Sequence, residues 1–189
     1  MAGNLERFLR ASPSTELADV AYTLALGRSP FERRAAIVSS SAKNAREALT
    51  AAAAGHDHNN LIVGRAVKAP RVAFVYSGQG SQTPGMGRDL FDSEPAFRDA
   101  LSRCAALLDG RFDKPLFDVM FGSGGTIHDT RYAQPCLFAF QYAMTELLAS
   151  WGIVPDAVIG HSIGEYAAAC TAGVLSLEDA LWLVERRSS

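Results

Sequence analysis

Gly160-His161-Ser162-Ile163-Gly164 decides the fold, because the residues around it predict a buried strand that passes directly into a helix. The stretch Asp156-Ala157-Val158-Ile159 precedes it and is typical of a buried strand, and residues 165–172 follow with a helical pattern. Glycine at both ends leaves room for a sharp turn that pushes the central side chain outward. Ser162 is therefore a candidate nucleophile at a helix N-terminus, where free amides and the helix dipole can hold an oxyanion. A glycine-rich turn with an ordinary capping serine is the alternative.

The composition indicates a globular protein without an electrostatic footprint for nucleic acid. The chain has 189 residues, of which 48% are hydrophobic and 20% charged, and its formal net charge is −2. Cys104, Cys136 and Cys170 are widely spaced within apolar helical patterns, which is typical of buried thiols in a reducing compartment. No secretory signal or bilayer-spanning run is present in the sequence, so we expect a cytoplasmic protein that binds neither membrane nor nucleic acid.

The pattern of the chain changes near Ala69-Pro70, which predicts two parts, 1–69 and 70–189. The first is expected to be a small α/β unit, with helices at 16–26 and 43–54 and strands at 35–40 and 61–67. His56 and His58 lie in a polar loop of this unit. They invite a metal-site interpretation, but no cysteine or carboxylate cluster at ligand spacing accompanies them, so a solvated loop and no metal are expected.

The second part predicts an α/β domain with a parallel sheet. Its strands at 72–76 and 157–159 are almost continuously apolar, which is typical of a parallel sheet covered on both faces. One helix is expected to begin after Pro135 and another to cover 177–187. Two strands are too few for such a sheet, so we expect the C-terminal portion of the domain to be missing from the chain.

A second glycine-rich loop, Ser77-Gly78-Gln79-Gly80-Ser81-Gln82, follows the strand at 72–76. A dinucleotide-binding loop would require a third glycine where Thr83 stands, and a phosphate-binding loop would require a Gly-Lys pair. A purely structural turn is a further alternative. In serine acyl enzymes built on a sheet, one oxyanion amide follows the nucleophile and the other comes from a loop after an earlier strand. Ile163 and Gln79 fit these two positions.

Three motifs in order resemble the acyltransferase domain of modular type I polyketide synthases and the related malonyl-CoA:acyl-carrier-protein transacylases. They are the segment 75–82, Tyr132-Ala133-Gln134-Pro135, and the segment 160–166. The stretch 17–24, with Gly27-Arg28 and Arg33-Arg34-Ala35, is similar to the linker between ketosynthase and acyltransferase. The resemblance implies a small α/β linker domain at 1–69, followed by part of an α/β-hydrolase-like acyltransferase core at 70–189.

The resemblance implies acyl transfer without a bound cofactor. Ser162 would take the acyl group of an acyl-CoA and pass it to the phosphopantetheine thiol of an acyl carrier protein, with the Gln79 and Ile163 amides at the oxyanion. Arg187 aligns with the family's arginine for the free carboxylate of a malonyl-type unit, although a cation at a helix C-terminus is the simpler interpretation of that residue. Gln134 would line the pocket, unless it caps the helix after Pro135. His161 would orient groups beside the substrate.

The family's catalytic histidine comes well after the serine, and no histidine follows Ser162 here. We therefore expect a fragment with little or no turnover. Ile163 and the stretch 132–135 resemble those of malonyl-type domains, so we expect malonyl units as substrate. A serine hydrolase or thioesterase is one alternative. A noncatalytic scaffold or docking fragment is another, since Lys and Arg outnumber Asp and Glu before residue 70 and such a surface favours an acidic carrier protein. The expected partners are an acyl carrier protein and, through the linker, a ketosynthase.

Overall fold

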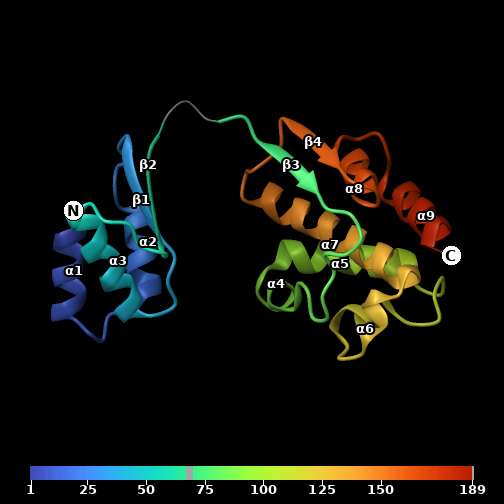
Figure 1. The fold of residues 1–189 in the computed structure, drawn as a ribbon, viewed down its shortest axis with the longest axis horizontal. Helices are drawn as coiled ribbons and strands as arrows, with labels where there is room; N and C mark the ends of the chain where they lie inside the picture. The colour runs from blue at the N-terminus through green and yellow to red at the C-terminus, as the bar shows by residue number, and fades with distance from the viewer. Residues whose placement is uncertain (67–69, 189) are drawn as a thin grey trace. The chain divides into compact units, whose positions relative to one another are not determined.

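The computed structural model describes residues 1–66 and 70–188, and the predicted strand residue Val67 lies outside them. Contacts between residues divide the chain into two units, Met1–Pro70 and Arg71–Ser189 (Figure 1). Both units combine helices with strands, which confirms the predicted α/β class. The roles that the sequence suggests for the two parts stay predictions. No described helix has the length and hydropathy needed to cross a bilayer.

The first unit packs helices beside an antiparallel strand pair. Its elements are α1 (Ala2–Ala11), α2 (Leu17–Leu26), β1 (Arg33–Ile37), α3 (Ala42–Ala54) and β2 (Leu61–Arg65). Helix α1 packs on α3, and the buried side chains come from these two helices. In the sheet, Arg33 lies opposite Arg65 and Ile37 opposite Leu61.

The strands of this unit are shorter or shifted relative to the prediction. β1 ends at Ile37 instead of residue 40, because the chain already turns there toward α3. The Ser39 hydroxyl accepts from the Ser41 amide at 3.2 Å, and the Ser41 hydroxyl accepts from the Asn44 amide at 3.2 Å and caps the helix. β2 ends at Arg65, two residues before the predicted end.

The second unit surrounds the long helix α7 with shorter helices and two strands. In chain order it contains β3 (Ala73–Tyr76), α4 (Arg88–Ser93), α5 (Pro95–Leu108), α6 (Leu116–Phe121), a 3-10 turn (Gly125–His128), α7 (Thr130–Ser150), β4 (Ala157–Gly160), α8 (Gly164–Thr171) and α9 (Leu177–Ser188). Helix α7 packs against α5, α8 and α9. The fully buried large side chains include Phe97, Phe138, Leu147 and Leu181, so the core of the unit lies around α7.

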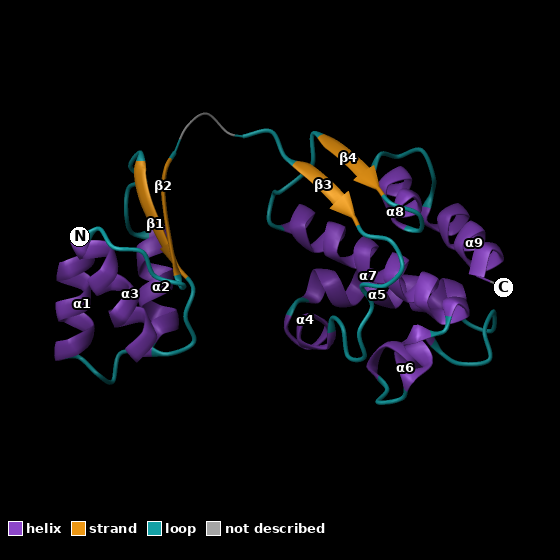
Figure 2. Ribbon diagram, viewed as in Figure 1, coloured by secondary structure: helices purple, strands orange, loops and turns teal. Residues whose placement is uncertain are grey.

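Strands β3 and β4 pair in parallel, as the sequence predicts (Figure 2). Ala73 lies opposite Ala157 and Tyr76 opposite Gly160, so both strands end at the same edge. The expectation of cover on both faces is wrong for the described residues. Val75 and Ile159 are 77% and 62% exposed, because α7 and α8 both lie on the face of Tyr76, whose hydroxyl bonds to Thr145 and Thr171.

Helix α7 begins five residues before Pro135, so the prediction that a helix starts after this proline is wrong. Asp129 caps the helix, since its carboxylate accepts from the Arg131 amide at 3.1 Å. Pro135 lacks the amide that would donate to the Arg131 carbonyl. The helix has 21 residues and is packed on several sides, so it tolerates the loss of one hydrogen bond.

Candidate active site

The turn between β4 and α8 holds Ser162 in a strained conformation. Its φ angle of 56° places it in the left-handed region, where no other non-glycine residue of the described chain lies. A side chain at position 160 would overlap the backbone of Gly164 and Glu165, and one at 164 would overlap the backbone of Tyr76 and Ser77. The two glycines are therefore required by close backbone approach, and the structure contains the sharp strand-to-helix turn that the sequence predicts.

The hydroxyl of Ser162 bonds to Arg187 and does not cap α8. Ile163 occupies the N-cap position, and no side chain caps this helix end. Arg187 donates from Nη2 to the Ser162 Oγ at 2.8 Å, and its guanidinium lies 5.6 Å from the centre of the Tyr166 ring. A capping role for the serine is therefore wrong. Arg187 is more than a cation at a helix end, because it reaches the candidate nucleophile.

Helix α9 positions Arg187 through its buried face and one ion pair. Leu181 and Val184 are buried against the core. Glu185 accepts from the Arg111 guanidinium at 2.7 Å, which ties the last turn of α9 to the turn that follows α5. The charged end of Arg187 is thus carried by a fixed helix, although the residue itself is exposed.

The loop after β3 lies beside the Ser162 turn. The His161 amide donates to the Tyr76 carbonyl at 3.0 Å, and a Cβ atom at Gly78 would lie 2.5 Å from the His161 Nδ1 atom. Both loops therefore leave the carboxyl ends of neighbouring parallel strands, the usual place for a ligand site in an open α/β sheet. The exposed His161 ring lies against Gly78, at the junction of the two loops.

Two backbone amides are available near this junction. Among the residues that the structure describes, neither the Gln79 amide nor the Ile163 amide has a hydrogen-bond acceptor. Unpaired amides at such a turn can donate to a negatively charged oxygen. Their assignment to an oxyanion stays a prediction.

The side chain of Gln79 connects the loop to the start of α7. Its Nε2 donates to the Thr130 hydroxyl at 3.0 Å, and its Oε1 accepts from the Gln134 Nε2 at 3.3 Å. Gln134 is 7% exposed and lies within α7, so the alternative that it caps a helix is wrong. Its Oε1 is buried without a partner among the described residues. A buried amide oxygen of this kind can accept a hydrogen bond from a ligand.

Comparison with known proteins assigns the chain to a family. A sequence profile described as "Acyl transferase domain" matches residues 73–189, which is more than half of the chain. The chain belongs to the acyl transferase domain family. A second profile, "CurL-like, PKS C-terminal", matches residues 1–49, ahead of the acyl transferase domain.

Similar proteins include synthases and transacylases. Polyketide synthase GfsA of Streptomyces halstedii is 47% identical over 175 residues, which cover 90% of this chain and 2% of the synthase. The solved acyl transferase domain of ZmaA is 38% identical with a TM-score of 0.88, covering 100% of this chain and 44% of the other. The malonyl CoA-acyl carrier protein transacylase of Clostridium perfringens is 27% identical with a TM-score of 0.57, covering 63% of this chain and 37% of the other. The chain thus spans less than half of the length of these proteins.

The sequence did not predict several polar residues that stabilise the candidate site. Gln141 is buried and bonds to the loop 77–82, the buried Gln82 bonds within that loop, and the Thr130 hydroxyl accepts from the Gln79 side chain. Gln141 lies in the middle of an apolar helix, and an isolated glutamine at such a position is the one local signal that could have identified it.

The cysteines of the domain are protected by burial. Cys104 and Cys136 are buried, and burial raises the pKa of each thiol to about 12. Cys170 is half-buried instead of fully buried, and burial raises its pKa as well.

In the described part of the chain, His, Cys, Asp and Glu form no group of three or more that could hold a metal ion. His58 uses its Nδ1 to accept from the Asn60 amide at 3.1 Å.

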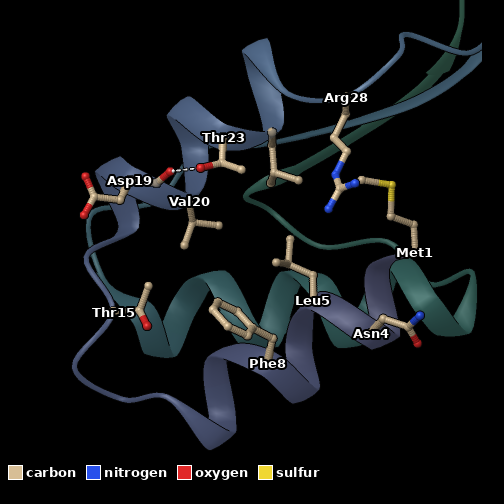
Figure 3. A pocket seen from close by; sticks show the side chains of 10 residues that line it. Met1, Asn4, Leu5, Phe8, Thr15, Asp19, Val20, Thr23 and Arg28 are labelled. Atoms are coloured by element: carbon tan, nitrogen blue, oxygen red, sulfur yellow. Dashed lines mark hydrogen bonds between the residues drawn. The ribbon is translucent and has the colours of Figure 1, made fainter.

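A separate hollow of about 610 Å³ lies in the first unit, between α1 and α2 (Figure 3). Its walls include Leu5, Phe8 and Val20, while Asp19 and Arg28 contribute the charged groups. Thr23 uses its hydroxyl to bond to the Asp19 carbonyl at 2.8 Å. The lining contains no cysteine or histidine, and none of its residues belongs to the candidate site around Ser162.

Proposed function

We propose that this chain carries the nucleophile and the substrate-carboxylate site of an acyltransferase that moves a malonyl-type unit from coenzyme A to an acyl carrier protein. The observation that carries the proposal is the 2.8 Å hydrogen bond from Arg187 to the hydroxyl of Ser162. It brings a guanidinium, the group best suited to a carboxylate, to a serine in a strand-to-helix turn. The name of the Clostridium perfringens transacylase supports both malonyl-CoA as donor and a carrier protein as acceptor.

The reaction has two acyl transfers. In the first, the Ser162 oxygen attacks the thioester carbonyl, the carbon–sulfur bond breaks, and the coenzyme A thiol leaves with the serine proton. In the second, the phosphopantetheine thiol of the carrier protein attacks the serine ester, and the serine recovers a proton as its carbon–oxygen bond breaks. Amides of Gln79 and Ile163 would stabilise the negative oxygen in both steps. Arg187 would hold the free carboxylate, and Gln134 and His161 would line the site.

The general base of this reaction has no assigned residue in the chain. All four histidines precede or directly adjoin Ser162, and His161 packs its ring against Gly78. Without a base, acyl enzymes retain the smaller acceleration that comes from the oxyanion site and substrate binding. We therefore expect slow acylation of Ser162 and little turnover in the isolated chain.

Intact-mass analysis after incubation with malonyl-CoA tests the proposal. We expect a malonyl adduct that forms over hours, maps to the peptide containing Ser162 and is absent from Ser162→Ala. Adding the phosphopantetheine form of a carrier protein should move the malonyl group to the carrier, whereas the form without phosphopantetheine should not. Equal adduct on Ser162→Ala, or none on the natural chain, would contradict the proposal. Release of free malonate without a carrier would favour the hydrolase or thioesterase alternative instead.

The first unit, by the same proposal, joins the acyltransferase to a ketosynthase. Its support is the match of residues 1–49 to the polyketide synthase profile and the curated relatives, which are synthases of much greater length. Sedimentation of the chain with a ketosynthase domain from the same synthase should show a complex. If the chain and the ketosynthase domain sediment independently even at concentrations well above their effective concentration inside a synthase, this role would be contradicted.

A further inference from the structure

The side-chain amide of Gln141 is one of the buried polar groups of the second unit, and the mechanism so far does not use it. Gln141 is 7% exposed, and its Oε1 has no partner among the described residues. Its Nε2 donates to the Ser77 carbonyl at 2.8 Å and lies 3.3 Å from the Ser77 hydroxyl oxygen. Because this buried side chain donates to the loop after β3, its hydrogen bonds stabilise the conformation of that loop.

A directed series of hydrogen bonds continues from Ser77. The Ser77 and Ser81 hydroxyl oxygens are 2.9 Å apart, and the Ser81 hydroxyl donates to the Gly78 carbonyl at 3.3 Å. Each hydroxyl has one proton to donate. When the Ser81 proton is on the Gly78 carbonyl, Ser77 donates to Ser81 and accepts from Gln141. This is the one arrangement in which all of these contacts are hydrogen bonds at the same time.

The last acceptor shares a peptide group with the Gln79 amide. A trans peptide is planar, and its carbonyl and amide point in opposite directions. Holding the Gly78 carbonyl toward Ser81 therefore holds the Gln79 amide away from it. We propose that Gln141, Ser77 and Ser81 form a relay that fixes the peptide plane between Gly78 and Gln79 and so aims the Gln79 amide. The catalytic meaning of this relay rests on the proposed oxyanion role of that amide.

The peptide on the other side of Gln79 is held as well. The Gly80 amide donates to the Gln82 Oε1 at 2.8 Å, and Gln82 is 6% exposed. The Gln79 side chain bonds at both ends, to Thr130 and Gln134. Both peptide planes and the side chain of Gln79 are thus fixed, while its amide stays without an acceptor. This arrangement is what a preorganised oxyanion donor requires, since it loses no reorganisation energy when charge develops.

Ser81→Ala tests the relay with little risk to the fold, because Ser81 is exposed. We expect the backbone amide resonance of Gln79 in a ¹H–¹⁵N spectrum to shift, and the slow acylation of Ser162 by malonyl-CoA to fall by roughly 10-fold, less than the loss of a whole oxyanion donor. Ser81→Thr keeps the hydroxyl and should restore both. Ser93→Ala is the matched control, since the exposed Ser93 hydroxyl also donates to a backbone carbonyl, that of Asp89 at 2.8 Å, away from the site.

Gln141→Leu should act in the same direction as Ser81→Ala, and a loss of its fold would leave the Ser81 variants to decide. An unchanged Gln79 resonance together with an unchanged acylation rate in Ser81→Ala would overturn the relay, as would failure of Ser81→Thr to restore them. Absence of acylation in the natural chain would count against the proposed function alone. The Gln79 resonance would then still decide the relay, because it is measured without any acyl donor.

Discussion

The guanidinium of Arg187 donates to the Ser162 hydroxyl across 2.8 Å, although 25 residues separate them along the chain. A fixed positive charge so close to a serine orients its oxygen. In the proposed reaction the carboxylate of the malonyl group would take over the guanidinium donors, since its two oxygens match the guanidinium fork with two parallel hydrogen bonds, whereas the hydroxyl offers one oxygen. The same arginine would thus hold the free serine and then the substrate.

Arg187→Ala should therefore change the choice of acyl donor. We expect the rate of Ser162 acylation by malonyl-CoA to fall about 10- to 100-fold, the effect of losing hydrogen bonds to a charged group. Acylation by acetyl-CoA, which has no free carboxylate, should change by less than about 3-fold on the same grounds. Time courses followed by intact mass measure both rates. An equal loss with both donors would show that Arg187 acts on the serine alone, and Arg187→Lys should retain part of the malonyl preference.

Gly164→Ala should destabilise the second unit strongly. The added Cβ would overlap the Tyr76 and Ser77 backbone, where no flexible side chain can move aside. Strain of this kind costs about 3 kcal/mol or more in free energy of unfolding, and loss of the folded unit is the extreme outcome. Denaturant unfolding followed by circular dichroism measures the change.

Gly125→Ala is the matched control for that substitution. A Cβ atom at Gly125 would have no neighbour within 4 Å, and the φ angle of this glycine is not in the left-handed region. Its free energy of unfolding should stay within about 0.5 kcal/mol of the natural chain. Similar losses in the two variants would mean that the close approach of β3 to the Ser162 turn is not what requires glycine at 164.

The Ser162 turn could be predicted because its signals are local. Glycines 160 and 164, the apolar strand before them and the helix after them lie within about 15 residues, and each limits the same backbone segment. Arg187 is different. Its contact with the serine depends on how α9 returns across the domain, which no local pattern contains, so only the family resemblance pointed to it.

Residues whose role depends on packing could not be predicted. Gln141 bonds to Ser77 from the middle of α7, and 64 residues separate them. The local sequence also predicts the wrong start for α7. Pro135 is a strong signal for a helix start, and the signal of the capping Asp129 is weaker. Tertiary contacts with α5 and α9 stabilise that helix through its proline, and they are invisible in the local sequence.

The buried thiols predict how stability depends on alkaline pH. Burial raises the pKa of the Cys136 thiol to about 12, whereas an unfolded cysteine ionises near about 8.5. Between these values the unfolded chain loses the proton and the folded chain keeps it. The contribution of the Cys136 thiol to the free energy of unfolding is therefore complete below the unfolded pKa. It is lost as the pH rises toward the folded pKa, by about 1.4 kcal/mol per pH unit.

Cys136→Ala removes this thiol and isolates its effect. At pH 8 the variant should be less stable than the natural chain, because it leaves a small cavity. As the pH rises from 8 to 10, that difference in stability should shrink. Ionisation of Cys136 in the unfolded state lowers the stability of the natural chain, and the variant has no thiol at this position. Urea unfolding under reducing conditions at both pH values measures it. A difference that stays constant would mean that the Cys136 thiol titrates alike in the folded and unfolded chain.

Free imidazole should accelerate the acylation of Ser162, because the chain has a nucleophile without an assigned base. General base catalysis contributes about 100- to 10,000-fold in enzymes, and a small diffusing base that reaches an exposed turn should recover about 10-fold of it. The measurement is the amount of malonyl adduct on the peptide that contains Ser162, and the Ser162→Ala variant gives the background. Pyrazole, a ring of the same size that is not basic at neutral pH, should have no effect. Rapid stoichiometric acylation without imidazole would contradict the prediction, because it would require a base already beside Ser162, where Arg187 now contacts the hydroxyl.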